Sequence, residues 1–442
     1  MKATRFNNVL TVALIAGLAA TAGTADAKQV GLDVSMANPL LEAGKKQVTY
    51  LKVGLTGFDM SSKKRAPVNV ALVIDKSGSM GGDKIQKAKQ AALAAVDRMD
   101  KDDIVSVVAY DSSVRVLVPA TKVSDRAAIR RGINQLTAGG STALFAGVSK
   151  GAREIRKFLE EDRVNRVILL SDGLANVGPD SPGELGDLGA SLAKERISVT
   201  TIGLGTGYNE DLMTQLARRS DGNHAFVEHS RDLARIFNYE FGDILSVVAQ
   251  EITVRIKCAR GIRPVRVLGR TAEISGRDVH VSLTQLYSKQ EKYIMLEVEV
   301  PEGRHGRAQD IASVEVAYAN MDTKTTDTLK SEIAVRFTED EEEVVKKTNN
   351  KVMADAVLHV ATAVNKKALK LRDQGKVAEA KSMLKNNTVY LKSQAKVLKS
   401  EKLSKYGDYN DRSASNLGDR DWDRERKLMR EEQMQIEYQR SY

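Results

Sequence analysis

The stretch VNVALVIDKSGSM, residues 68–80, joins an apolar run to a short polar motif. The apolar run predicts a buried β-strand. In the motif that follows, Asp75, Ser77 and Ser79 stand at alternate positions, and alternate side chains of an extended segment point the same way. Carboxylate and hydroxyl oxygens are hard ligands that suit Mg²⁺, Mn²⁺ or Ca²⁺. The stretch therefore predicts a divalent-cation site at the end of a strand.

Strands and helices alternate around this motif, from residue 67 to residue 249. We expect strands at 68–74, 103–110, 114–118, 164–170, 197–204 and 223–227, and helices at 83–99, 124–136, 142–160, 183–196, 209–220 and 231–248. This alternation predicts an α/β domain with a doubly wound, mostly parallel sheet between two layers of helices. Ligands bind such sheets beyond the carboxyl ends of the strands. Asp75 and Asp172 both lie at such an end.

Two further segments have the composition that a cation site needs. Residues 139–142, GGST, precede a predicted helix, and Gly147 follows the threonine within that helix. Residues 171–173, SDG, follow a buried strand. Together with Asp75-x-Ser77-x-Ser79, these segments resemble the metal-ion-dependent adhesion site of the von Willebrand factor type A family. The resemblance extends over residues 68–248, in the motifs and in the order of the elements.

The resemblance implies a role for each motif residue. Ser77 and Ser79 would ligate the ion directly through their hydroxyl groups, and Thr142 would do so when a ligand is bound. Asp75 and Asp172 would hold the ion mainly through water, and a partner's carboxylate would fill the remaining coordination position. Mg²⁺ is the ion we expect, because it retains water ligands readily. Mn²⁺ and Ca²⁺ are the alternatives.

One position departs from the family pattern. Many members place threonine directly after the two glycines, where this chain has Ser141. The spacing to Gly147 favours Thr142 as the ligand. Ser141 is the alternative.

The flanking segments predict two further parts. Residues 28–66 contain strand patterns, and 250–338 read as a series of strands typical of an antiparallel β-sandwich. Because the N-terminal strands have no sheet of their own, we expect them to join the sandwich, with the α/β domain inserted between. Residues 339–405 predict a helical hairpin, and 406–442 a charged, disordered tail whose end could form a helix when bound. These flanks resemble, more loosely, bacterial secreted type A proteins related to inter-alpha-trypsin inhibitor heavy chains.

Residues 1–27 predict a secretory signal peptide. Lys2 and Arg5 precede the apolar run 9–20, and the small-residue triplet Ala25–Ala27 provides a cleavage site; an uncleaved anchor is the alternative. Cys258 is the only cysteine, so no intramolecular disulfide can form, which favours a bacterial periplasm; secretion or a place on the cell surface is the alternative. Cleavage removes two basic residues and one acidic residue, so the net charge falls from +10 to +9. We expect this excess to be spread over a basic solvated surface.

The sequence contains none of the common catalytic motifs that we sought. There is no His-Glu-x-x-His, no Gly-x-Ser-x-Gly elbow, and residues 203–207 lack the Gly-Lys-Ser/Thr of a P-loop. The prediction is therefore an exported, metal-dependent adhesion or scaffold protein, not an enzyme, that captures an acidic side chain of a protein partner. No nucleic-acid partner and no membrane-spanning segment after cleavage are expected. The alternatives are a structural protein of the cell envelope, whose partners bind the sandwich and the C-terminal helices, and a metal-assisted hydrolase.

Overall fold

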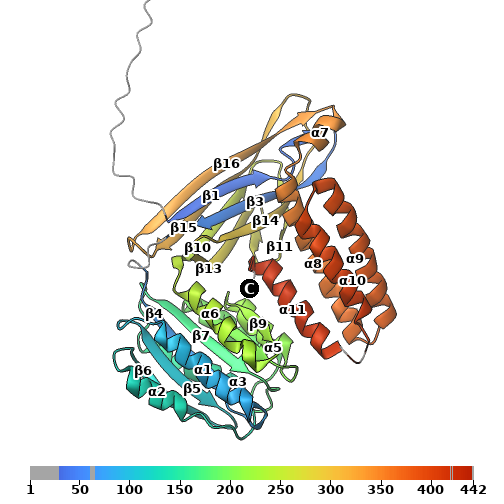
Figure 1. Cartoon of the computed structure of the whole chain (residues 1–442). Coiled ribbons are helices and arrows are strands. Elements are labelled where there is room, and N and C mark those ends of the chain that lie inside the picture. The colour runs from blue at the N-terminus through green and yellow to red at the C-terminus, as the bar shows by residue number, and fades with distance from the viewer. Residues whose placement is uncertain (1–28, 60–64, 419, 421, 441–442) are drawn as a thin grey trace, which may run out of the picture.

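The computed structural model describes residues 29–59, 65–418, 420 and 422–440, so the predicted signal peptide lies outside the described residues. The described chain forms three parts: an α/β domain, a β-sandwich and a group of C-terminal helices (Figure 1). Along the chain, the α/β domain lies between two groups of sandwich strands, at residues 30–57 and 247–338, as expected of an insertion. No helix among these residues is long and apolar enough to cross a membrane.

The α/β domain contains a sheet with strand order β6-β5-β4-β7-β8-β9, in which only β6 runs antiparallel to its neighbour. Helices α1, α2 and α6 pack on one face, and α3, α4 and α5 on the other. The strands are β4 Val68–Asp75, β5 Ile104–Tyr110, β6 Val114–Lys122, β7 Val164–Ser171, β8 Ile197–Leu204 and β9 His224–Val227. The helices are α1 Asp83–Asp97, α2 Arg126–Asn134, α3 Leu144–Arg156, α4 Pro182–Lys194, α5 Glu210–Arg219 and α6 Leu233–Ile244.

The predicted doubly wound sheet is confirmed. Strands β4, β5, β7 and β8 are buried at every position. Helices cover both faces of these strands, which is why their sequences are continuous apolar runs and not alternating ones.

Two sheets form the sandwich, with orders β1-β3-β14-β11 and β12-β13-β10-β15-β16-β2. The N-terminal strands do join it: β1 and β3 pair within one sheet, and β2 pairs with β16 in the other. Its strands are β1 Val30–Met36, β2 Leu40–Glu42, β3 Gln47–Gly57, β10 Val247–Cys258, β11 Arg263–Leu268, β12 Glu273–Ser275, β13 Asp278–Tyr287, β14 Glu291–Val300, β15 Ala308–Asn320 and β16 Thr326–Thr338. Strand β10 thus begins slightly before the predicted start of this part at residue 250.

The C-terminal region differs from the prediction. The predicted hairpin is present as α8 Asn350–Asp373 and α9 Val377–Leu398, after the short helix α7 Glu341–Lys347. The predicted disordered tail is wrong: α10 Glu401–Ser415 and α11 Trp422–Tyr438 are folded helices that pack with them. Each buries a few widely spaced apolar residues, such as Tyr406 and Met429, within a polar sequence.

Helix α11 connects the helical part to the α/β domain. It lies against α8 on one side and against α5 and β9 on the other. Arg426 of α11 forms ion pairs with Asp211 of α5 and Asp373 of α8, and the Lys427 ammonium lies 2.8 Å from Glu210. Ion pairs therefore replace much of the apolar contact that a buried helix usually makes.

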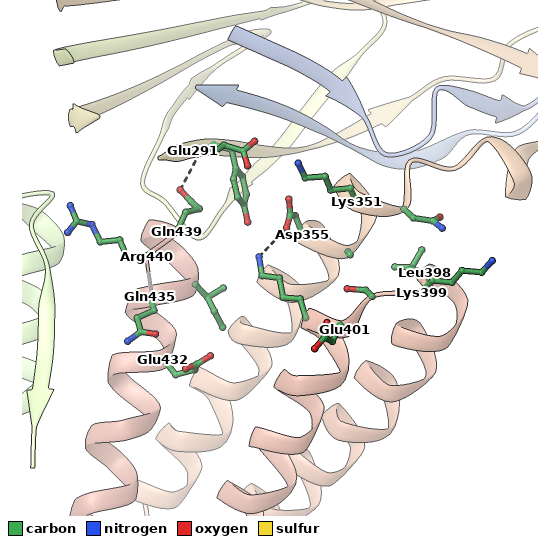
Figure 2. Close-up of a pocket in the computed structure, with 16 residues that line it drawn as sticks. Glu291, Lys351, Asp355, Leu398, Lys399, Glu401, Glu432, Gln435, Gln439 and Arg440 are labelled. Atoms are coloured by element: carbon green, nitrogen blue, oxygen red, sulfur yellow. Dashed lines mark hydrogen bonds and ion pairs between the residues drawn. The ribbon is translucent and has the colours of Figure 1, made fainter. Parts of the chain in front are cut away.

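A cavity of about 790 Å³ lies where the sandwich, α8, α10 and α11 meet. Figure 2 shows Glu291, Asp355 and Glu432 at its wall, from β14, α8 and α11. The Lys52 ammonium lies 2.9 Å from both Glu291 and Asp355, and Lys402 reaches the second oxygen of Asp355 at 3.2 Å. These pairs join four elements across the junction, β3, β14, α8 and α10, so we interpret the charges of this wall as structural.

Candidate metal site

The predicted site residues lie at the edge of the α/β sheet that faces away from the sandwich. Gln250 of β10 donates a hydrogen bond to the carbonyl of Arg163, just before β7 begins. The amino ends of the parallel strands therefore face the sandwich. Asp75 ends β4 and Asp172 follows β7, so both carboxylates lie at the opposite, carboxyl edge. This is the edge where ligands bind in sheets of this topology.

Hydrogen bonds bring the first motif and the third together. The Ser79 hydroxyl donates to Asp172 Oδ1 at 2.6 Å, and the hydroxyl oxygens of Ser77 and Ser79 are 3.1 Å apart. Ser77 and Asp172 are each only 2% exposed, whereas Ser79 is exposed. The cluster is thus anchored in the protein and open on the side of Ser79.

Asp75 lies beneath these hydroxyl groups. Its Oδ1 accepts a hydrogen bond from the backbone N–H of Ser77 at 2.8 Å, and its Oδ2 accepts one from the Ser171 hydroxyl at 2.6 Å. Its side chain is fully buried, and burial raises the pKa of this carboxyl, against the effect of the Ser171 hydrogen bond. Both oxygens are engaged by the protein. This agrees with the expectation that Asp75 holds the ion mainly through water and does not ligate it directly.

Thr142 approaches the same cluster from the loop before α3. An ideal Cβ placed on Gly173 would lie 3.2 Å from the Thr142 hydroxyl, 3.3 Å from that of Ser79 and 3.8 Å from that of Ser77. The three hydroxyl oxygens therefore surround a small space above Gly173, which any side chain at this position would fill. The backbone of Thr142 is fixed by Asn176, whose side chain accepts its N–H at 2.8 Å. Ser141 instead donates its N–H to the Ser112 hydroxyl at 2.9 Å.

Two glycines of the second motif are required by the structure. Gly140 has a φ of +86°, and a Cβ there would lie 3.0 Å from the side chain of Asp111. Its carbonyl accepts the N–H of Gly78 at 3.0 Å, which ties the first motif to the second. Gly147 lets α3 pack closely on β5, since a Cβ would lie 2.8 Å from the ring of Tyr110. Only glycine combines this backbone conformation and these close approaches.

Sequence reasoning missed several neighbours of the site. Lys84, in the first turn of α1, forms an ion pair with Asp172, and Lys76 forms one with Asp111. Asn176 holds Thr142 as described. A lysine or an asparagine at these distances from a motif has no recognisable spacing, so no signal in one sequence identifies them.

The donor set fits a small divalent cation. The cluster offers two carboxylates and three hydroxyl groups, and the described residues contain no group of three or more His, Cys, Asp or Glu that could hold a metal. Hydroxyl and carboxylate oxygens suit Mg²⁺ and Mn²⁺, and a low count of protein charges leaves such an ion electrophilic. The three hydroxyl oxygens all lie within 3.8 Å of the Cβ position of Gly173. The assignment of the individual ligands stays a prediction.

The fold and these motifs define a class: residues 69–238 match the von Willebrand factor type A domain, so the chain carries a domain of this family. An uncharacterized protein of Synechocystis is 27% identical over 66% of this chain and 71% of its own length. Inter-alpha-trypsin inhibitor heavy chain H3 of Pongo abelii is 31% identical over 36% of this chain. A solved von Willebrand factor type A protein of Catenulispora acidiphila has a TM-score of 0.70 at 18% identity and covers 88% of this chain and 89% of its own.

The comparisons differ in extent. The chain spans 71% of the Synechocystis protein but only 19% of heavy chain H3, so the similarity to the latter is limited to a segment. The structural match extends over most of both chains and therefore includes the parts that flank the type A domain. At 18% identity it establishes the fold alone.

Proposed function

We propose that this protein is an exported, metal-dependent binding protein, an adhesion or scaffold component that captures an acidic side chain of a protein partner. Ser77, Ser79 and Thr142 would hold a divalent cation, Mg²⁺ in preference to Mn²⁺ or Ca²⁺, with Asp75 and Asp172 behind them. The ion would supply a positive charge with a free coordination position. A carboxylate of the partner would occupy that position.

The space above Gly173 carries this proposal. Three hydroxyl groups from two loops converge there, and hydroxyl groups do not neutralise a cation. The carboxylate of Asp75 is engaged by Ser77 and Ser171. An ion in this place would keep most of its charge and attract an external carboxylate strongly.

A binding role is favoured over catalysis. Of the histidines, His224 is buried with Thr201 and Tyr208, and burial lowers its pKa to about 4. Cys258 lies in the sandwich core, where burial raises the pKa of its thiol to about 11. Neither group offers a base or a nucleophile to the site. Export to the periplasm is part of the proposal and rests on the signal-peptide pattern of residues 1–27.

The sharpest test fills the proposed ion position without removing a ligand. Gly173→Ala keeps all five predicted site residues but places a methyl group 3.2–3.8 Å from the three hydroxyl oxygens. We expect calorimetric titration with Mg²⁺ to show binding by the wild-type protein and a loss of at least tenfold in affinity in the variant. Gly183→Ala is the matched control, because a Cβ there meets only Ser181 at 3.9 Å.

Partner capture is tested in the same way. Affinity purification from the native envelope should recover the partner with Mg²⁺, but neither in EDTA nor with Gly173→Ala. Equal Mg²⁺ affinity in the two glycine variants would refute the proposed ion position. Equal capture in EDTA would refute the metal-dependent mode of binding.

A further inference from the structure

Within the helical part, basic charge is concentrated in two helices, α8 and α9. Residues 350–399, which contain α8 and α9, have eleven Lys or Arg residues and three Asp or Glu residues, a net charge of +8, while the whole chain has +10. The expectation of an evenly spread excess is therefore wrong. A local excess of this size creates a positive potential that selects anionic partners.

Four lysines of α9 form one stripe on its exposed surface. They stand at relative positions i, i+4, i+11 and i+15, which lie within about 60° of each other around an α-helix. The stripe consists of Lys381, Lys385, Lys392 and Lys396, all exposed. Lys392 pairs with Asp408 of α10 at 3.0 Å. The other three extend the positive charge over four turns of the helix.

An apolar strip lies beside this lysine stripe. Val389 is 69% exposed, Val397 is 63% exposed and Tyr390 is 40% exposed. The strip continues into a shallow groove of about 510 Å³ between α8 and α9, where Val364 and Met383 contribute to the wall. Val389 lies next to the lysine stripe, and Val397 lies farther round the helix. The core does not explain why these valines are exposed, because the core of this bundle uses the opposite face of α9.

The rest of α9 shows that this face is not needed for folding. Leu384 and Leu391 are fully buried on the other side of the helix, and Asn387 donates a hydrogen bond to the Ala361 carbonyl of α8 at 3.0 Å. Helix α9 packs chiefly on α8 and α10 and lies on the outer side of the bundle, away from the type A domain, with Tyr390 on the side that approaches Tyr50 of the sandwich (Figure 1). A flat surface can therefore approach it.

We propose that this face of α8 and α9 docks onto an anionic lipid bilayer surface. The lysines would contact acidic headgroups, and Val389, Val397 and Tyr390 would enter the interfacial layer. On α8, Lys367 stands one turn after Val364 and is exposed, so basic side chains border the apolar strip on both sides. Lysines beside a tyrosine and aliphatic residues are typical of helices that lie in the membrane interface.

The composition favours a lipid surface over an acidic protein. Lysine is depleted at protein–protein interfaces, which use arginine and large aromatic residues instead. Lysine stems, by contrast, extend along apolar surface while the ammonium reaches headgroups or water. The groove beside the strip is also wide open to solvent and does not form a deep pocket for an anchor residue.

Vesicle sedimentation tests the proposal with the full protein. We expect binding to vesicles of phosphatidylcholine with 30% phosphatidylglycerol, none to pure phosphatidylcholine, and a steep loss of binding with salt. A lysine near an anionic surface contributes about fivefold in affinity, so Lys381→Gln/Lys385→Gln/Lys396→Gln should bind about 100-fold more weakly. The control removes three exposed lysines outside the helical part: Lys101→Gln/Lys194→Gln/Lys257→Gln.

A second variant separates insertion from simple charge attraction. Val389→Asn/Val397→Asn keeps the charge and substitutes exposed positions, so the fold is retained; its binding should weaken several-fold at high salt. Equal binding of the two triple lysine variants would overturn the proposal, as would unchanged binding of the valine variant. Binding to polyglutamate without binding to anionic vesicles would overturn it in favour of an acidic protein partner.

Discussion

The metal-site loops and the α11 junction both contain buried carboxylates, but these carboxylates are paired with different groups. At the junction, Glu210 faces Arg426 and Lys427, and although burial alone would raise its pKa, these cations hold the pKa of its carboxyl below its ordinary value. At the site, three hydroxyl groups lie around the space above Gly173, and the carboxylates of Asp75 and Asp172 lie behind them, each hydrogen-bonded to a serine hydroxyl group. A polar cluster that is closed on itself stabilises the fold, whereas one that converges on a space is suited to a ligand.

Arg426→Ala attacks the closed network most severely. Glu210, Asp211 and Asp373 would lose their common guanidinium group while they remain largely shielded from water. Lys427 would still pair with Glu210 and Arg430 with Asp211, so we expect the free energy of unfolding in denaturant to fall by about 3 kcal/mol, the lower end of the cost of an uncompensated buried charge. Lys405→Ala, which removes an exposed ion pair of α10, is the control and should change little. Equal losses in the two variants would remove the distinction.

Mg²⁺ tests the open cluster in the same measurement. At a concentration 100 times its Kd, a ligand that binds only the folded state adds about 2.7 kcal/mol to the free energy of unfolding. We expect this increment in the wild-type protein and in Arg426→Ala, because the two clusters share no residue and their effects should add. It should vanish with EDTA and in Gly173→Ala. An increment that disappears in Arg426→Ala would show that the clusters are coupled.

The difference between the metal site and the α11 junction also explains which parts of the structure could be predicted from the sequence. The type A domain was predictable because residues 68–74 and 164–170 are continuous apolar runs, each followed by a motif at a strand end. The sequence predicted the ligand residues but not the space above Gly173, because the spacing of motifs along the chain does not determine how two loops meet. Helix α11 was predicted only as a helix that forms on binding, because its ion pairs join it to residues about 200 positions away, such as Arg426 with Asp211. Helix α10 was missed because its sequence is polar and buries few apolar residues. Composition alone assigns such a segment to disorder.

Glu431 is an exception within the closed network. Its carboxylate accepts a hydrogen bond from the backbone N–H of Phe226 at 2.9 Å, and burial raises its pKa to about 7 from an ordinary 4.5. The folded state therefore binds this proton more tightly than the unfolded state does, so stability falls as the pH rises from about 4.5 to about 7. Glu431→Gln keeps an acceptor and removes the charge, so it should stabilise the protein by about 1–3 kcal/mol at pH 8.

Chemical denaturation at pH 8 and at pH 4 checks this sign. The gain from Glu431→Gln should shrink towards zero at pH 4, where the wild-type carboxyl is protonated in both states. A gain that is equal at the two pH values would attribute the effect to packing and not to the buried charge. Glu431 would then belong with the junction residues, such as Glu210, whose charge is compensated in the folded protein.

Lys84 produces the smallest expected effect and tests how open the metal site is. Its ammonium pairs with Asp172 although the lysine side chain is 37% exposed, so it competes with a divalent cation for that carboxylate. Lys84→Met removes the competing charge, and we expect Mg²⁺ to bind about five- to tenfold more tightly in calorimetric titration. Lys89→Met, on the same helix, is the control. Weaker Mg²⁺ binding in Lys84→Met would mean that the lysine positions Asp172 for the ion. The metal site would then depend on an internal ion pair, as the network at the α11 junction does, and the proposed difference between the two regions would be wrong.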